Sequence, residues 1–297
     1  MADELLNLEP SPDAKYLLAG WRRQWSDGGE ISSGLPRYLI DKRQAKRIGE
    51  MGPEVSRLCY PFQVPGTHDT YRPRVSYQDG LPSKEMQREN AFFDAGNGLI
   101  IFLGEEPWFR LDVYAQAFFR AVRELGVLQT VAVEGYNGAA PPEMERSVSC
   151  IYSQPHMKEV LEQYGLRFSN YGTQSRNGPT IGMALITVAH FEHADLEMFR
   201  MGAMAPMFPF LTQNNDPVGI SRDHRAFYDI LRRLNAMLKL ELDLSELMSL
   251  GEAESQELRE TLERLPEVAR KLLEERPDHN QSVLTNMDII ATFKRLY

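Results

Sequence analysis

Three short apolar runs, at residues 16–21, 99–104 and 130–135, set the pattern of this chain. Each run is mostly aliphatic, is too short for a free-standing helix, and ends in or next to glycine. This pattern favours strands that are buried on both faces. Helical patterns lie between and after the runs, and an alternation of strands and helices predicts an α/β fold with a mostly parallel sheet.

The helix that follows the second run has the most regular pattern. Its apolar positions recur at helical spacing, and Gly126 follows as a C-terminal cap. They are Leu111, Tyr114, Ala115, Phe118, Phe119, Val122 and Leu125. A short turn then leads to the third run, so a right-handed crossover predicts that the second and third strands lie side by side and parallel.

Weaker patterns predict the remaining elements. Residues 1–14 form a lead-in, and a helix covers about 30–50, with its basic cluster on a solvated end. A nearly all-apolar helix follows Pro179 and is expected to be deeply buried. A methionine-rich strand covers 197–204, and Ser221 is expected to cap the next helix.

Changes in composition indicate the domain organisation. Residues 1–242 are expected to form the α/β domain, with a β-rich insert near 51–95 where proline and glycine are frequent. From residue 243 Glu, Leu, Arg and Lys dominate, which predicts a charged helical tail over 243–297. The tail packs either on its own domain or on another subunit.

The bulk properties narrow the functional classes. The net charge of −9 argues against nucleic acid as a partner, because phosphate neutralisation supplies most of that affinity. No apolar run is long enough to cross a bilayer, and the acidic N-terminus does not resemble a signal peptide. Two cysteines do not make a disulfide framework. These features predict a cytoplasmic protein with no membrane partner.

Polar and aromatic residues follow the predicted strands. The carboxyl ends of parallel strands meet at one edge of a sheet, where ligands of α/β proteins usually bind. The candidate ligand-binding residues there are Trp21, Asp27, Glu105, Glu106, Trp108, Glu134 and Asn137. In the alternative interpretation the carboxylates cap helices and the tryptophans fill gaps between loops and sheet.

A second candidate is the turn that enters the apolar helix. Arg176, Gly178 and Thr180 stand where backbone N–H groups at a helix start attract anions. The turn is neither a Walker loop nor a dinucleotide fingerprint. A tight structural entry into a buried helix explains the same residues.

No catalytic constellation can be named. Cys59 and Cys150 are expected to be buried and inert. His190 and His193 lie three residues apart, but no further ligand stands at a zinc spacing. The sequence therefore predicts no metal, no cofactor and no catalytic residue.

The order of several short motifs resembles the proteasome assembly chaperone 2 family, in its bacterial and archaeal branch, over about residues 15–250. The motifs include Gly20-Trp21, Asp27-Gly28-Gly29, Leu103-Gly104-Glu105-Glu106-Pro107, Val133-Glu134-Gly135-Tyr136, Gly178-Pro179-Thr180-Ile181-Gly182, Ala205-Pro206-Met207-Phe208-Pro209 and Leu242-Asp243-Leu244-Ser245-Glu246-Leu247. The resemblance implies a three-layer α/β/α sandwich like that of nucleoside phosphorylases and related hydrolases, with no established catalytic residues.

The resemblance also implies a function. We expect a non-catalytic, homo-oligomeric assembly-chaperone-like protein with another protein as its client. Some relatives dock on proteasomes through a penultimate tyrosine, whereas this chain ends in Arg295-Leu296-Tyr297, with the tyrosine last. The alternative is a small-molecule-binding protein or a hydrolase- or ligase-like enzyme that uses the strand-end cleft.

Overall fold

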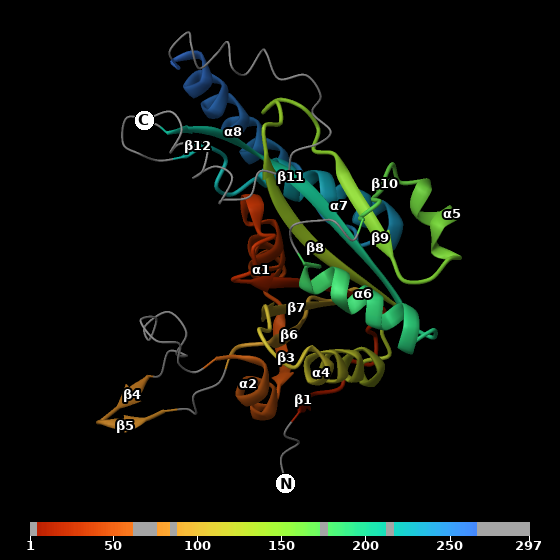
Figure 1. The fold of residues 1–297 in the computed structure, drawn as a ribbon. Coiled ribbons are helices and arrows are strands. Elements are labelled where there is room, and N and C mark those ends of the chain that lie inside the picture. Colours follow the sequence, from red (N-terminus) through yellow and green to blue (C-terminus); the bar gives the residue numbers. More distant parts are fainter. Residues whose placement is uncertain (1–4, 62–75, 84–87, 173–177, 212–216, 266–297) are drawn as a thin grey trace. The chain divides into compact units, whose positions relative to one another are not determined.

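The structure is a computed structural model that describes residues 5–61, 76–83, 88–172, 178–211 and 217–265. The chain divides into two compact units, each built from three segments (Figure 1). Unit 1 comprises Met1–Gln24, Pro36–Ala132 and Pro179–Met198. Unit 2 comprises Trp25–Leu35, Val133–Gly178 and Phe199–Tyr297.

Three parallel strands form the centre of the unit 1 sheet. Strand β2 (Tyr16–Arg22) pairs in parallel with β7 (Leu99–Glu105) on one side and with the first residues of β8 (Gln129–Gly138) on the other. Residues 17–21 of β2 are buried, as expected for a strand covered on both faces. The three apolar runs are therefore strands, as predicted.

The prediction that the second and third strands lie side by side is wrong. Strand β2 lies between β7 and β8, so the connection through α4 (Leu111–Glu124) crosses over one strand. A buried apolar run identifies a strand, but it does not determine which strand lies beside it. The handedness rule fixes how a crossover turns and leaves open how many strands it passes.

Antiparallel strands extend the unit 1 sheet beyond β7. Strand β6 (Ala91–Asp94) pairs with β7, β3 (Lys46–Met51) pairs with β6, and β1 (Leu6–Leu8) pairs with β3. The lead-in predicted for residues 1–14 thus contains a strand. Strand β1 escapes sequence analysis because it has only three residues.

The helix predicted over 30–50 is too long. Helix α1 (Ile31–Arg43) ends at Arg43, Gln44 turns the chain with a φ of 48°, and β3 follows. The basic cluster at 42–47 is consequently split between a helix end and a strand. Only Ile48 and Met51 of β3 are buried, so its apolar pattern is too sparse to identify it.

The helices of unit 1 include α2 (Pro53–Cys59), α4 and α6 (Ile181–Glu192). The apolar stripe predicted for α4 is confirmed from Tyr114 to Leu125, where Phe118 packs edge-on to Phe102 of β7 at 5.3 Å, but its first position, Leu111, is 37% exposed. The prediction that α6 is deeply buried is wrong. Its buried residues lie on one face, and Phe191 is 79% exposed.

A small hairpin forms the described middle of the predicted β-rich insert. Strands β4 (Tyr77–Gln78) and β5 (Leu81–Pro82) pair antiparallel around an Asp79-Gly80 turn. Both turn residues have positive φ, as hairpin turns of this type require.

Unit 2 contains a second group of strands around β11 (Glu197–Leu211), whose residues from Phe199 onward belong to this unit. Strand β9 (Val148–Tyr152) and β12 (Pro217–Gly219) pair antiparallel with β11, and the short β10 (Arg167–Phe168) pairs in parallel with β9. The methionine-rich strand is confirmed and is longer than predicted. Met198 and Met201 are fully buried, which favours a packing role for them over an adaptable surface.

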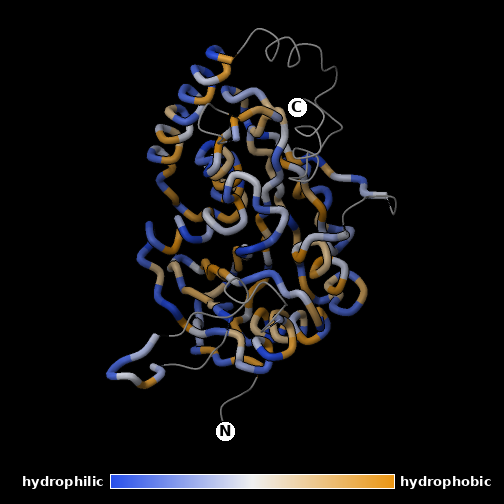
Figure 2. Tube along the Cα trace, turned by 60° about the vertical axis from the view of Figure 1, so that its left-hand side comes forward, coloured by the Kyte–Doolittle hydropathy of each residue, from blue (hydrophilic) through white to orange (hydrophobic). Residues whose placement is uncertain are grey.

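The helices of unit 2 are short or amphipathic. Among the described residues they are η1 (Gly28–Glu30), the first turn of α1, α5 (Met157–Glu162), α7 (His224–Leu238) and α8 (Ser245–Glu263). Helix α7 begins after Asp223, whose carboxylate accepts from the Ala226 N–H, so the predicted cap at Ser221 is wrong. Hydrophobic positions recur between hydrophilic ones along α8 (Figure 2).

These elements confirm the predicted α/β fold with a large central sheet and a helical segment after residue 243. Helix α8 packs against α7 within unit 2, and the end of the predicted tail, 266–297, lies outside the described residues. In the described part of the chain, no helix combines the length and apolar character needed to cross a membrane.

Candidate functional site

Trp21 lies inside the core of unit 1. Its side chain is fully buried, and its indole Nε1–H donates to Tyr114 Oη over 2.8 Å. Its ring stands edge-on to Phe102, with 6.0 Å between the ring centroids. Trp21 therefore packs between strands and helix α4, as in the structural alternative.

Glu105 ends β7 within a polar cluster of unit 1. Its carboxylate forms an ion pair of 3.1 Å with Arg88, which is 4% exposed. Its carbonyl accepts from Tyr60 Oη at 2.7 Å, and its N–H donates to Asn90 Oδ1 at 2.9 Å. Burial raises the pKa of Tyr60 well above its ordinary value, so the hydroxyl stays protonated and donates. Both the backbone and the carboxylate of Glu105 thus have internal partners.

Glu106 and Trp108 continue from this strand end. The Glu106 N–H donates to the Arg22 carbonyl over 3.1 Å, which extends the strand pairing by one residue. The Trp108 N–H donates to the Cys59 carbonyl over 2.8 Å and ties the start of α4 to the end of α2. The Trp108 side chain is 49% exposed, unlike that of Trp21.

Several large apolar side chains are exposed around the contact between α2 and α4. We call this group the α2–α4 patch: Leu58, Trp108, Phe109 and Leu111. Between 37% and 55% of each residue is exposed. Groups of exposed apolar side chains are typical of surfaces that contact another protein.

Glu134 forms a buried ion pair in unit 2. Its Oε2 lies 2.6 Å from Arg200 Nε, and the two side chains are 0% and 3% exposed. Arg200 also donates to Ser149 Oγ at 3.2 Å, and its guanidinium carbon lies 6.0 Å from the centre of the Tyr171 ring. The half-exposed Tyr171 thus lies beside the guanidinium that neutralises the Glu134 carboxylate.

Asp27 caps the start of α1. Its Oδ1 accepts from the N–H groups of Ser32 and Ser33 at 2.8 and 2.9 Å, and its Oδ2 accepts from Ser33 Oγ at 2.6 Å. Burial raises the pKa of Asp27 to about 6, against the lowering effect of these hydrogen bonds. This is the capping role of the structural alternative.

The loop that carries Asp27 lies directly against β8. Asp27 forms a parallel bridge with Gly135, and a Cβ on Gly28 would stand 2.7 Å from Asn137 Oδ1. Asn137 Oδ1 is buried, and no described residue gives it a hydrogen bond. The structure thus brings the Asp27 and Asn137 segments together in unit 2.

The predicted anion site is described only in part. Thr180 Oγ1 accepts from the Met183 N–H at 3.2 Å and caps α6. Gly178 is exposed, and Arg176 lies outside the described residues. The cap satisfies one of the N–H groups that an anion would use.

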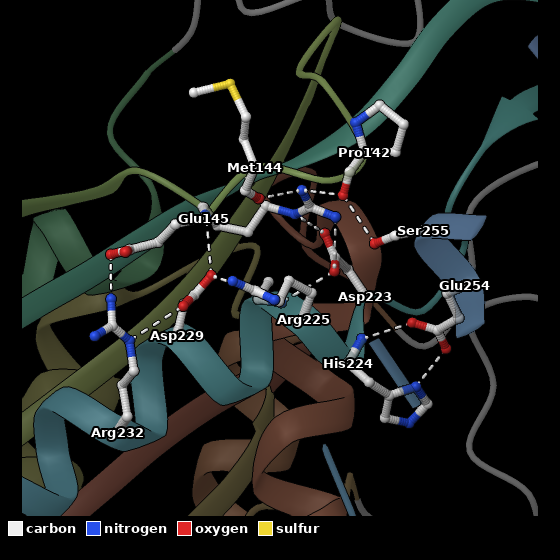
Figure 3. A network of polar contacts seen from close by, with 12 residues as sticks. Pro142, Met144, Glu145, Asp223, His224, Arg225, Asp229, Arg232, Glu254 and Ser255 are labelled. Carbon is white, nitrogen blue, oxygen red and sulfur yellow. Dashed lines mark hydrogen bonds and ion pairs between the residues drawn. The ribbon is translucent and has the colours of Figure 1, made fainter. Parts of the chain in front are cut away.

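Unit 2 contains a buried polar network that the sequence does not indicate (Figure 3). Arg146 Nε forms an ion pair of 2.8 Å with Asp223 Oδ2, and both side chains are 1% exposed or less. The same guanidinium donates to the carbonyls of Pro141, Pro142 and Met144 over 2.8–3.2 Å. One arginine therefore holds the loop between β8 and β9 against the start of α7.

Asp229 and Glu254 extend the network along α7. Asp229 accepts from the Arg146 N–H at 2.8 Å and pairs with Arg225 and Arg232. Glu254 of α8 accepts from the N–H of His224 at 3.0 Å and also binds its ring (Figure 3). The sequence signal was an acid before a helix, at Asp223, but the arginine partner is 77 residues away.

Both cysteines and His193 have neighbours within the fold. Cys59 and Cys150 are buried, and burial raises their thiol pKa values to about 11 and about 12, so both remain thiols at neutral pH. His193 Nδ1 lies 3.1 Å from the guanidinium of Arg123. No three His, Cys, Asp or Glu side chains among the described residues are grouped as metal ligands.

Comparison with known proteins gives a family match and a shared fold. The model of the PAC2 family matches residues 23–265. A Mycobacterium tuberculosis proteasome-assembly chaperone homologue, Rv2125, superposes with a TM-score of 0.64 at 19% identity, over 86% of this chain and 99% of that chain. No curated protein matches the sequence.

Two archaeal structures share the fold as well. Pyrococcus furiosus PbaA, a homologue of proteasome-assembly chaperones, has a TM-score of 0.55 at 16% identity, over 91% of this chain and 97% of that chain. Pyrococcus furiosus PbaB, an archaeal proteasome activator, has a TM-score of 0.56 at 14% identity, over 88% and 99% of the two chains. At these identities the likeness concerns the fold.

Proposed function

Because the chain belongs to the PAC2 family, we propose that it is a non-catalytic assembly-chaperone-like protein whose ligand is another protein. One observation carries the proposal: three of the candidate carboxylates have partners within the fold. Glu134 is neutralised by Arg200, Glu105 pairs with Arg88, and Asp27 caps α1. Carboxylates held in this way support the fold and are poorly placed to act as a base or as metal ligands.

We propose a homo-oligomer with a protein client as the working form. The α2–α4 patch supports this proposal, because Trp108 and Phe109 present large rings to solvent at a rigid helix junction. Exposed aromatic residues are enriched in protein interfaces, where they supply most of the binding energy. The names of Rv2125, PbaA and PbaB associate those relatives with the proteasome.

Variants of the patch test this function. We expect Trp108→Ala and Phe109→Ala to reduce the amount of protein partner that co-purifies with the tagged chain, because each removes a large exposed ring. Leu128→Ala is the matched control: Leu128 is 66% exposed but follows the opposite end of α4. Equal capture by all three variants and the unmodified protein would remove the patch from the account.

The alternative function is small-molecule binding in unit 2. Asn137 Oδ1 favours it, because this buried acceptor has no described donor and lies against Gly28, next to Asp27. A ligand with an N–H or O–H group would satisfy it. Asn137→Leu would then abolish the uptake of a small molecule that stays with the protein through purification, and a protein-only complex would be unaffected.

A further inference from the structure

Helix α8 covers a small apolar cluster that is separate from the main core. Leu258 of α8 packs with Phe208 of β11 and with Val218 and Ile220 at β12, and all four are 5% exposed or less. Leu262 and Leu265 extend the contact at its edge. Without α8, this strip on β11 and β12 would be open to solvent.

The seam by which α8 packs is narrow and contains little apolar surface. Its buried residues are Leu247, Gly251, Ser255 and Leu258, so two of the four are small. Met248 and Leu250 of the same helix are 40% and 39% exposed. Burial of apolar area is the main force that holds an amphipathic helix in place, so α8 is less firmly seated than α4.

Specific contacts fix the register of this seam. A Cβ on Gly251 would lie 2.8 Å from the backbone of Arg225, so only glycine fits against α7 there. Glu254 binds the first N–H of α7 at His224, and Ser255 Oγ donates to the Pro142 carbonyl over 2.8 Å. The positive end of the α7 helix dipole complements an acidic helix. Residues 245–263 contain six acids and one arginine.

The connection between α7 and α8 is conformationally strained. Lys239 and Glu241 both have a φ of 53°, although neither is glycine. The Asn235 side chain holds the turn by bonding both the N–H and the carbonyl of Leu242. Left-handed conformations are unfavourable for such residues and often occur at segments that change conformation.

We propose that α8 is a reversible cover, and that the strip beneath it is the docking site for an acidic amphipathic helix of the client. The client helix replaces α8 and uses the same features: a glycine against Arg225, a carboxylate at the start of α7, and a leucine on Phe208, Val218 and Ile220. This inference rests on the proposed protein-binding function. It adds where on this chain the partner binds and which side chains the partner uses.

The test uses the full chain and a labelled peptide of residues 245–263 as the probe. Gly251→Leu should displace α8, because the added side chain meets the backbone of Arg225. Ala253→Leu adds the same side chain on the exposed face and is the matched control. We expect the peptide to bind the Gly251→Leu chain at least tenfold more tightly than the wild type or the Ala253→Leu chain.

Hydrogen exchange gives a second readout. The His224 N–H should exchange faster in the Gly251→Leu chain, and the peptide should restore its protection, because Glu254 of the peptide replaces Glu254 of the chain. A peptide that itself carries Gly251→Leu should neither bind the Gly251→Leu chain nor restore protection of its His224 N–H. If the Gly251→Leu chain does not fold, Gly251→Ala is used instead. The peptide should again bind the Gly251 variant more tightly than the wild type or the Ala253→Leu chain.

Three results would overturn the inference. The first is a folded Gly251 variant that does not bind the peptide, and the second is equal binding to all three chains. The third is a wild-type dimer that the peptide dissociates, which would assign the strip to α8 of a second copy. Binding of the peptide as expected, together with no protein partner on the unmodified chain, would instead contradict the proposed function and leave the cover in place.

Discussion

At the residue scale, buried charges with distant partners dominate the candidate site. Arg88, Arg146 and Arg200 each neutralise a carboxylate from another element. The sequence identified Glu105 and Glu134 as notable because they follow apolar strands, but it could not supply their partners. Glu134 and Arg200 are 66 positions apart, and no local spacing links them. A single sequence therefore indicates these carboxylates but not their arginine partners.

The Glu134–Arg200 pair leads to a stability prediction. Arg200→Met leaves a fully buried carboxylate without a counter-charge, so we expect the free energy of unfolding to fall by about 3–5 kcal/mol. The double variant Arg200→Met with Glu134→Leu should recover much of this loss. Urea denaturation measures both. A loss below about 1 kcal/mol in the single variant would show that the pair is not structural.

Asp27 leads to a pH prediction. Burial raises its pKa from 3.8 to about 6, so its contribution to stability is present below pH 3.8 and is lost as the pH rises through 6. Asp27→Asn, which keeps one capping oxygen, should therefore gain stability relative to the wild type from pH 4 to pH 7, by up to roughly 3 kcal/mol.

Urea denaturation at several pH values measures this difference. Asp195→Asn serves as the control, because the hydrogen bond from Arg123 lowers the pKa of Asp195 and its pH dependence has the opposite sign. A difference between Asp27→Asn and the wild type that does not change with pH would contradict the assignment.

At the element scale, the sequence predicted what depends on continuous burial. Strand β7 and helix α4 were identified because almost every inward position is apolar. Strand β3 was taken for helix because Ile48 and Met51 alone are fully buried in it. The order β7-β2-β8 was missed because strand adjacency depends on long-range packing. Elements with a strong local pattern can thus be predicted from the sequence, but which strands lie next to each other in the sheet cannot.

The cap of α6 distinguishes the two interpretations of the predicted anion site. Thr180 Oγ1 accepts from the Met183 N–H, so Thr180→Ala should lower the free energy of unfolding by about 1 kcal/mol. Thr180→Ser keeps a capping hydroxyl and should retain most of this stabilisation. Thermal denaturation with and without inorganic phosphate checks the role. The account predicts the same loss in both buffers, and a loss confined to the phosphate buffer would favour an anion site.

At the scale of the whole molecule, the chain combines a PAC2-family α/β fold with a helix that covers its own apolar strip. The fold class followed from the alternation of strands and helices, and the helical segment after residue 243 followed from composition. The structure adds the exposed α2–α4 patch in unit 1 and the apolar strip beneath α8 in unit 2, and we propose both as surfaces for protein contact. A role in protein binding therefore agrees with features of both units.

Native mass spectrometry of the untagged protein, gently purified from its own cells, tests this role most directly. We expect a homo-oligomer that carries a substoichiometric protein partner and no small added mass. A reproducible small added mass without any protein partner would contradict the account and would assign the function to a small-molecule site.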